Sequence, residues 1–155
     1  MVTVVFADLA GFTALAEGRD PERAKEVLDE IFGVLAPVVV GNGGHVDKII
    51  GDELMAVFGA PVAHEDDPER AVRAALGLAV ALDDLGDGVH AGGRLALRVG
   101  INTGEVMAGP VGPSGAPTVT GDSVNTAHRL VSAARAGEIL VGETTWAATS
   151  HAVEY

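Results

Sequence analysis

The alternation of apolar and polar residues predicts a β-sheet that begins at the start of the chain. Residues 2–7 are apolar on both faces of an extended strand, which is typical of a buried strand, and this run ends at Asp8. Two further β-prone runs lie within 44–59 and flank the pair Gly51-Asp52, so this stretch is expected to form a hairpin with Asp52 at its tip. Glycine at the first central position of the turn supplies the positive φ of a type II′ turn.

Apolar residues with helical spacing alternate with these strands. Asp20-Pro21-Glu22 and Asp67-Pro68-Glu69 each place a capping acid before a proline at the first helical position. They predict helices that extend to about residue 40 and about residue 85. A third helix is expected at 121–134 and a short one at 143–150.

The other segments are expected to be strands, turns and loops. In chain order they are a Gly-rich connection at 86–93, a strand at 95–101, a turn at 102–104, a returning strand at 105–108, an irregular loop at 109–117, a short extended piece at 118–120 and a last strand at 138–141. This order predicts an α+β fold over residues 1–155, with a ferredoxin-like βαββαβ core and helices packed on one face of a mostly antiparallel sheet.

Composition excludes several classes of protein and of site. The chain has no cysteine, which excludes disulfides and thiolate zinc sites, and no histidine pair with metal-ligand spacing. Its net charge of −12 would repel a nucleic acid backbone. The longest apolar stretch is broken by Pro37 and is far shorter than the roughly 20 residues that a bilayer requires. With no secretory signal at Met1 either, we expect a cytoplasmic setting.

Charged and polar residues mark three candidate positions. Asp8 ends a strand and is followed by a Gly-containing turn, Gly11-Phe12-Thr13, which forms an anion-binding corner if it opens a helix. Asp8 could equally be a helix-capping acid. Lys48 lies four residues before Asp52 in the hairpin, so a base and an acid share one element. Asn125 and Arg129 share a helix face, an arrangement that is usual on a solvated surface.

Three motifs resemble the catalytic domain of the class III nucleotidyl cyclases, the adenylyl and guanylyl cyclase homology domain. They are FADLAGFT at 6–13, DKIIGDELMAVFG at 47–59 and VTGDSVNTAHRL at 119–130. They occur in the family's order and at similar spacing, and the resemblance extends over nearly the whole chain. The resemblance implies an adenylyl cyclase that makes 3′,5′-cyclic AMP and pyrophosphate from ATP.

The resemblance also implies roles for individual residues. Asp8 and Asp52 match the aspartates that hold two divalent ions, Mg²⁺ or Mn²⁺, and the turn Gly11-Phe12-Thr13 would meet the phosphates. Lys48 and Thr118 match the residues that select adenine, whereas guanylyl cyclases typically have glutamate at the position of Lys48.

Asn125 and Arg129 match the pair that orients the ribose and stabilises charge on the transferring phosphoryl group. In the family these groups meet across a dimer interface, and since this chain matches both halves, a homodimer with two shared sites is expected.

Three departures from the family pattern leave an alternative open. The segment before Thr118 lacks a frequent tyrosine and basic residue, His128 occupies a position that is usually small, and no late lysine precedes Tyr155, so the domain at 1–155 would lack the family's C-terminal hairpin. The alternative is a catalytically silent nucleotide-binding or dimerisation module that regulates an attached domain. An acidic interaction domain would require three coincidental motif matches, and no GxxxxGK[ST] loop is present.

Overall fold

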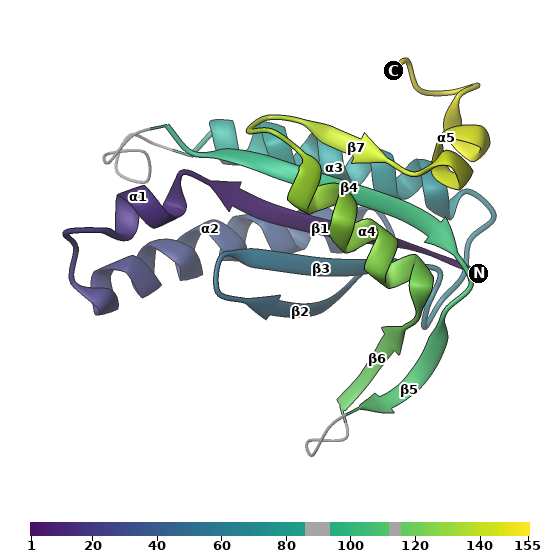
Figure 1. The fold of residues 1–155 in the computed structure, drawn as a ribbon, viewed down its shortest axis with the longest axis horizontal. Helices are drawn as coiled ribbons and strands as arrows, with labels where there is room; N and C mark the ends of the chain where they lie inside the picture. The colour runs from purple at the N-terminus through teal and green to yellow at the C-terminus, as the bar shows by residue number, and fades with distance from the viewer. Residues whose placement is uncertain (86–93, 112–115) are drawn as a thin grey trace.

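The computed structural model describes residues 1–85, 94–111 and 116–155. Its helices pack around a central β-sheet (Figure 1). The strands in these residues are β1 (Val2–Ala10), β2 (His45–Ile50), β3 (Glu53–Phe58), β4 (Ala96–Gly104), β5 (Met107–Val111), β6 (Ala116–Thr120) and β7 (Ile139–Val141). The helices are α1 (Phe12–Ala16), α2 (Pro21–Gly41), α3 (Asp67–Asp83), α4 (Asp122–Ala133) and α5 (Glu143–Thr149). The Gly-rich connection expected at 86–93 lies outside the described residues.

The main sheet has the strand order β2-β3-β1-β4-β7. The first four strands pair antiparallel, and β7 adds to β4 in parallel. The four antiparallel strands β1, β2, β3 and β4, together with α2 and α3, form the predicted ferredoxin-like βαββαβ core. The central strand is β1 because its residues are apolar on both faces and can therefore be covered on both sides.

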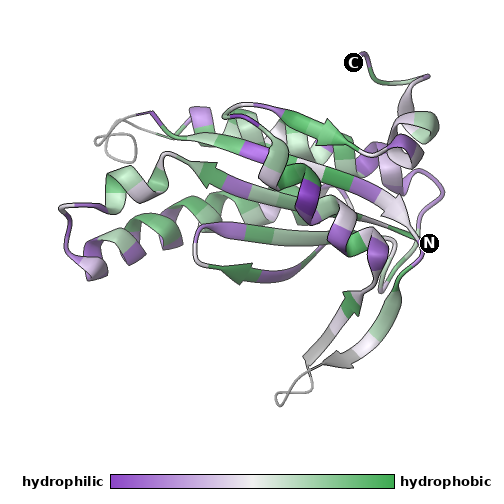
Figure 2. Ribbon diagram, in the orientation of Figure 1, coloured by the Kyte–Doolittle hydropathy of each residue, from purple (hydrophilic) through white to green (hydrophobic). Residues whose placement is uncertain are grey.

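The two faces of β1 pack against different helices. Val5 and Leu9 belong to a large core with α2 and α3, which lie together behind the sheet in Figure 1. Val4 and Phe6 point the other way, into a smaller core that includes Ala127 of α4. Figure 2 shows the corresponding band of apolar residues along the strands. The expected helix layer on one face is therefore α2 and α3, and α4 adds a partial layer on the other.

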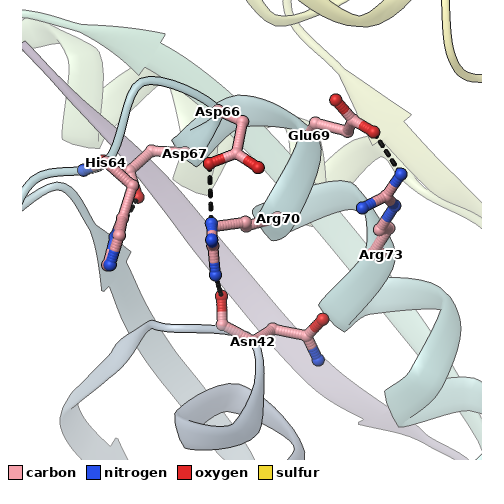
Figure 3. A network of polar contacts seen from close by, with 7 residues as sticks. All are labelled: Asn42, His64, Asp66, Asp67, Glu69, Arg70 and Arg73. Carbon is pink, nitrogen blue, oxygen red and sulfur yellow. Dashed lines mark hydrogen bonds and ion pairs between the residues drawn. The ribbon is translucent and has the colours of Figure 1, made fainter.

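A polar network joins the end of α2 to the start of α3 (Figure 3). Arg70 donates from Nε to Asp66 Oδ1 at 2.7 Å and from Nη1 to the carbonyl oxygen of Asn42 at 3.5 Å. Asp67 accepts the backbone N–H of His64 at 2.7 Å, and this preceding loop is thereby held against the helix it leads into. These contacts position the turn from which β2 begins.

The segment after β4 differs from the prediction. The turn expected at 102–104 is wrong, because β4 continues to Gly104 and pairs with β1 up to Val2. The strand expected at 105–108 does not return to the sheet. Instead β5 pairs with β6 as a separate ribbon that projects from the body (Figure 1). Of the loop expected at 109–117, residues 109–111 and 116–117 are therefore strand, and residues 112–115 lie outside the described residues.

No helix within the described residues is long and apolar enough to cross a membrane.

Candidate active site

Two aspartates from different elements lie close together at one end of the sheet. Asp8 is near the end of β1, where the register pairs it with Glu53, the residue after Asp52. The backbone N–H of Leu9 also donates to the carbonyl oxygen of Asp52 at 3.2 Å. Gly51 has the expected positive φ, 58°, while no described non-glycine residue has one, which agrees with a type II′ turn. The hairpin tip therefore brings Asp52 beside Asp8.

The two carboxylates repel each other and are only partly compensated. Burial, followed by the charge of Asp8, raises the pKa of Asp52 above its ordinary value. Arg98 of β4 donates from Nη2 to Asp8 Oδ2 at 2.9 Å. Asp8 Oδ1 is buried and has no hydrogen-bond partner. Because carboxylate oxygens are the ligands that Mg²⁺ and Mn²⁺ prefer, this orphaned oxygen beside a second acid fits a divalent cation.

The turn between β1 and α1 shares a pocket with Asp52. Gly11 has φ 90°, a left-handed conformation that lets the chain leave β1 and enter α1 directly. Phe12 is buried, and Thr13 is exposed. Together with Gly51 and Asp52, Phe12 and Thr13 line a pocket of about 440 Å³. The first backbone N–H groups of a helix have no partner within that helix, so this pocket has donors available for an anion.

Thr118, one of the two residues expected to recognise a base, lines a second pocket, of about 310 Å³. Thr118 of β6 and Asp47 of β2 line it, together with apolar residues that include Val57. Thr118 Oγ1 donates to Asp47 Oδ2 at 2.6 Å, and Lys48 Nζ lies 3.6 Å from the same oxygen. The structure therefore brings Lys48 and Thr118 to one carboxylate.

The predicted pair on α4 projects into solvent. Asn125 and Arg129 are both exposed, and Arg129 donates from Nη2 to Thr126 Oγ1 at 3.0 Å. In the described part of the chain neither side chain is hydrogen-bonded to the acids or to the base-pocket residues. On the same helix, the ring of His128 lies edge-on to the ring of Phe6, with 5.2 Å between the ring centroids.

His128 Nε2 also lies 3.5 Å from Glu53 Oε1. Burial raises the pKa of Glu53, while the adjacent imidazole acts in the opposite direction. This contact links α4 to β3 next to the hairpin turn that carries Asp52.

The predicted site residues thus fall into separate groups within one chain. The pocket beside Asp52 and the pocket beside Thr118 have no lining residue in common. Asn125 and Arg129 belong to neither. Within the described residues, one copy of the chain holds the expected set divided among the acidic end of the hairpin, the surroundings of Asp47 and the exposed face of α4.

Comparison with known proteins identifies the family. The family model of the adenylate and guanylate cyclase catalytic domain matches residues 1–154. The chain belongs to this family. Among its relatives, Adenylate cyclase 1 of Rhizobium meliloti is 36% identical over 83% of this chain and 20% of its own length, and an adenylate cyclase of Mycobacterium tuberculosis is 33% identical over 93% of this chain and 32% of its own length. The domain thus spans a fifth to a third of these relatives.

Solved structures give the same fold for this cyclase domain. The adenylyl cyclase CyaB from P. aeruginosa superposes with a TM-score of 0.92 at 32% identity, covering 99% of this chain and 82% of that one. The guanylyl cyclase Cya2 superposes with a TM-score of 0.88 at 36% identity, covering 95% and 77%. Relatives of both nucleotide types therefore share this fold, so the fold alone does not select the base.

Two residues of the cyclase domain were missed by the reasoning from sequence. Arg98 is a lone charge within an apolar strand, and this pattern could have marked it as a residue with a specific partner. The partner, Asp8, is 90 residues away in the sequence, so the pairing itself was not predictable. Asp47 lies within a recognised motif, yet no role was predicted for it. Strict alternation along β2 would place Asp47 and Lys48 on opposite faces.

Proposed function

We propose that this domain is an adenylyl cyclase that converts ATP to 3′,5′-cyclic AMP and pyrophosphate at sites shared by two copies of the chain. The observation that carries the proposal is the division of the site residues into separate groups on one chain. Two-fold symmetry would bring the acidic pocket of one copy to the base pocket and α4 of the other, twice. The named adenylate cyclase relatives, at 33–36% identity, support the same reaction.

Asp8 and Asp52 would hold the two divalent ions, Mg²⁺ or Mn²⁺, on which the cyclase activity depends. Two features fit this role: Asp8 Oδ1 is buried without a hydrogen-bond partner, and burial together with the charge of Asp8 raises the pKa of Asp52, which a bound cation would offset. Ions held there would supply a lowered pKa for the ribose 3′-hydroxyl and positive charge for the departing pyrophosphate. The turn at Gly11, Phe12 and Thr13 would donate backbone N–H groups to the phosphates.

Lys48 and Thr118 would select adenine. The ring nitrogen N1 of adenine accepts a hydrogen bond, which matches the ammonium group of Lys48, whereas guanine presents an N–H there and favours a carboxylate. Thr118 lines the pocket of about 310 Å³, and Asp47, which lines it too, links Thr118 to Lys48 within one chain.

Asn125 and Arg129 would act on the nucleotide held by the acids of the partner subunit. The ribose 3′-oxygen attacks the α-phosphorus, the bond to the bridging oxygen breaks and pyrophosphate leaves with the electron pair. Asn125 would orient the ribose, and the guanidinium of Arg129 would stabilise the charge that develops on the transferring phosphoryl group. Both side chains are exposed on α4 and are therefore accessible to a nucleotide bound by a neighbouring subunit.

Mixing two inactive variants tests the shared site. Asp8→Ala damages the acidic half and Arg129→Ala damages the α4 half, so each variant alone should lose cyclase activity. In a random mixture half of the dimers carry both variants and contain one intact site out of two, which predicts about a quarter of wild-type activity.

The matched control mixes Asp8→Ala with Asp52→Ala. Both changes damage the acidic half, so no dimer of that mixture has an intact site, and activity should not return. An inactive first mixture of folded proteins would refute the shared site. ATP binding by the wild-type domain without any cyclic product would instead favour the silent regulatory module.

A further inference from the structure

Asp47 is a buried carboxylate at the base pocket, and it reaches this position through an irregularity in β2. The β2–β3 register shifts between Val46 and Lys48, so Asp47 is an extra residue in the strand. Such a bulge re-aims a side chain that regular alternation would direct elsewhere. The Asp47 side chain is 4% exposed, and it lines the pocket together with Thr118.

The contacts of Asp47 determine which hydrogen bonds Thr118 can still make. A threonine hydroxyl has one proton and two lone pairs. The proton of Thr118 is donated to Asp47 Oδ2 at 2.6 Å, a length typical of a strong hydrogen bond to a charged oxygen. Asp47 accepts hydrogen bonds when ionised and cannot return a proton. The Thr118 oxygen can therefore only accept a hydrogen bond from a bound base.

We propose that Asp47 is a specificity-determining, positioning residue that makes Thr118 an obligatory acceptor and thereby favours 6-amino purines over 6-oxo purines. Adenine has an amino donor at C6, whereas guanine and hypoxanthine have a carbonyl acceptor there. A 6-oxo purine would place two acceptors against each other, which is costly in a site that excludes water. The inference rests on the proposed function in one respect, namely that the purine is bound at Lys48 and Thr118.

A purely structural role for Asp47 predicts a different result. The Thr118–Asp47 hydrogen bond also joins the β5–β6 ribbon to β2, so its loss could loosen the pocket. Loosening would lower the turnover of all nucleotides to a similar extent. A change in the ratio between two purines would not follow from it.

The test compares ATP with ITP, whose base is hypoxanthine. The ratio of their kcat/KM values is measured for the wild-type domain, for Asp47→Asn, whose amide can donate as well as accept, and for Asp47→Ala, which removes the acceptor. In both variants the Thr118 proton is no longer committed to a carboxylate, so the ATP preference should fall roughly tenfold. Asp29→Asn on the exposed face of α2 removes the same charge far from the pocket and should leave the ratio unchanged.

A double-mutant cycle determines whether Asp47 acts through Thr118. Thr118→Val removes the hydroxyl, and on that background Asp47→Asn should produce no further change in the ratio. An equal change with and without the hydroxyl would overturn the proposal, as would a wild-type ratio in both Asp47 variants.

The failure of this inference is distinguishable from failure of the proposed function. If the wild-type domain makes cyclic AMP but the Asp47 variants keep the wild-type ATP preference, the proposed function stands and the inference about Asp47 is refuted. If the wild-type domain makes no cyclic product, the ratio of the dissociation constants for ATP and ITP is measured instead in the same variants. The same changes in that ratio would then support or overturn the role of Asp47, and equal wild-type affinity for the two nucleotides would overturn it.

Discussion

Adding one methyl group at Gly100 should displace the helix that carries Asn125 and Arg129. Gly100 lies on β4 beneath α4, and a Cβ placed there would be 2.5 Å from the carbonyl oxygen of Ala127 and would also overlap the backbone nitrogen of Val131. Both neighbours are helix backbone, so neither can give way by rotation of a side chain. Ordinary contact begins at 3.4 Å, which means that α4 must move by about 1 Å.

The expected cost of Gly100→Ala follows from that displacement. Overpacking of this kind costs about 1–3 kcal/mol of unfolding free energy. For a domain of this size that lowers the melting temperature by roughly 3–10 °C. A misplacement of about 1 Å in catalytic groups can reduce kcat on the order of 100-fold. Thermal unfolding by circular dichroism and steady-state production of cyclic AMP measure the two effects separately.

Gly33→Ala is the matched control, because it adds the same methyl group to an exposed helical position with no atom within 4 Å of the new Cβ. It should stabilise α2 by about 1 kcal/mol and leave kcat unchanged. Mixed with Asp8→Ala, the Gly100→Ala variant should recover activity, since its acidic half is intact; mixed with Arg129→Ala it should not. Wild-type stability and kcat in Gly100→Ala would refute the reasoning.

Three further predictions concern the base-reading lysine and the acidic pair. Lys48→Glu should lower the turnover of ATP relative to that of GTP, and an unchanged ratio would count against Lys48 as a base-reading residue. Because the pKa of Asp52 is raised in the fold, the folded chain binds a proton there more tightly than the unfolded chain, so this group's contribution to stability is present below about pH 4 and is lost as pH rises through the folded pKa. Urea unfolding of the metal-free domain across this range should therefore show a smaller loss with rising pH in Asp52→Asn, and parallel curves would contradict the assignment. Arg98→Met should leave Asp8 without its partner and cost about 1–3 kcal/mol without metal, and added Mg²⁺ should recover more stability in this variant than in the wild type, as measured by the shift in melting temperature.

Much of the fold was predictable from local sequence. The Asp-Pro-Glu signatures at 20–22 and 67–69 identified the starts of α2 and α3, because a proline in the first helical turn has no N–H that would need a partner there. At α2 the preceding acid, Asp20, also accepts the backbone N–H of Glu22, whereas at α3 the acid Asp67 is itself the first helical residue and the N-cap is Asp66. The Gly51-Asp52 hairpin was equally local, since a type II′ turn needs one glycine and two flanking strands. The prediction failed at 102–104, where a turn was expected, and at 109–111 and 116–117, where Gly and Pro suggested a loop. There β4 continues because β1 pairs along its whole length, and two proline-containing strands pair only with each other.

By itself the sequence determined the family and the residue types of the candidate site, because three motifs in register carry Asp8, Asp52, Lys48 and Asn125. Only the tertiary structure decided which of these groups meet. A register shift in β2 turns the carboxylate of Asp47 onto the pocket, and the pairing of β1 with β4 places Arg98 on Asp8. The Asp47–Thr118 and Asp8–Arg98 hydrogen bonds both join segments that are far apart in the chain. Both depend on strand register, which arises from the packing of the whole sheet and leaves no local pattern in the sequence.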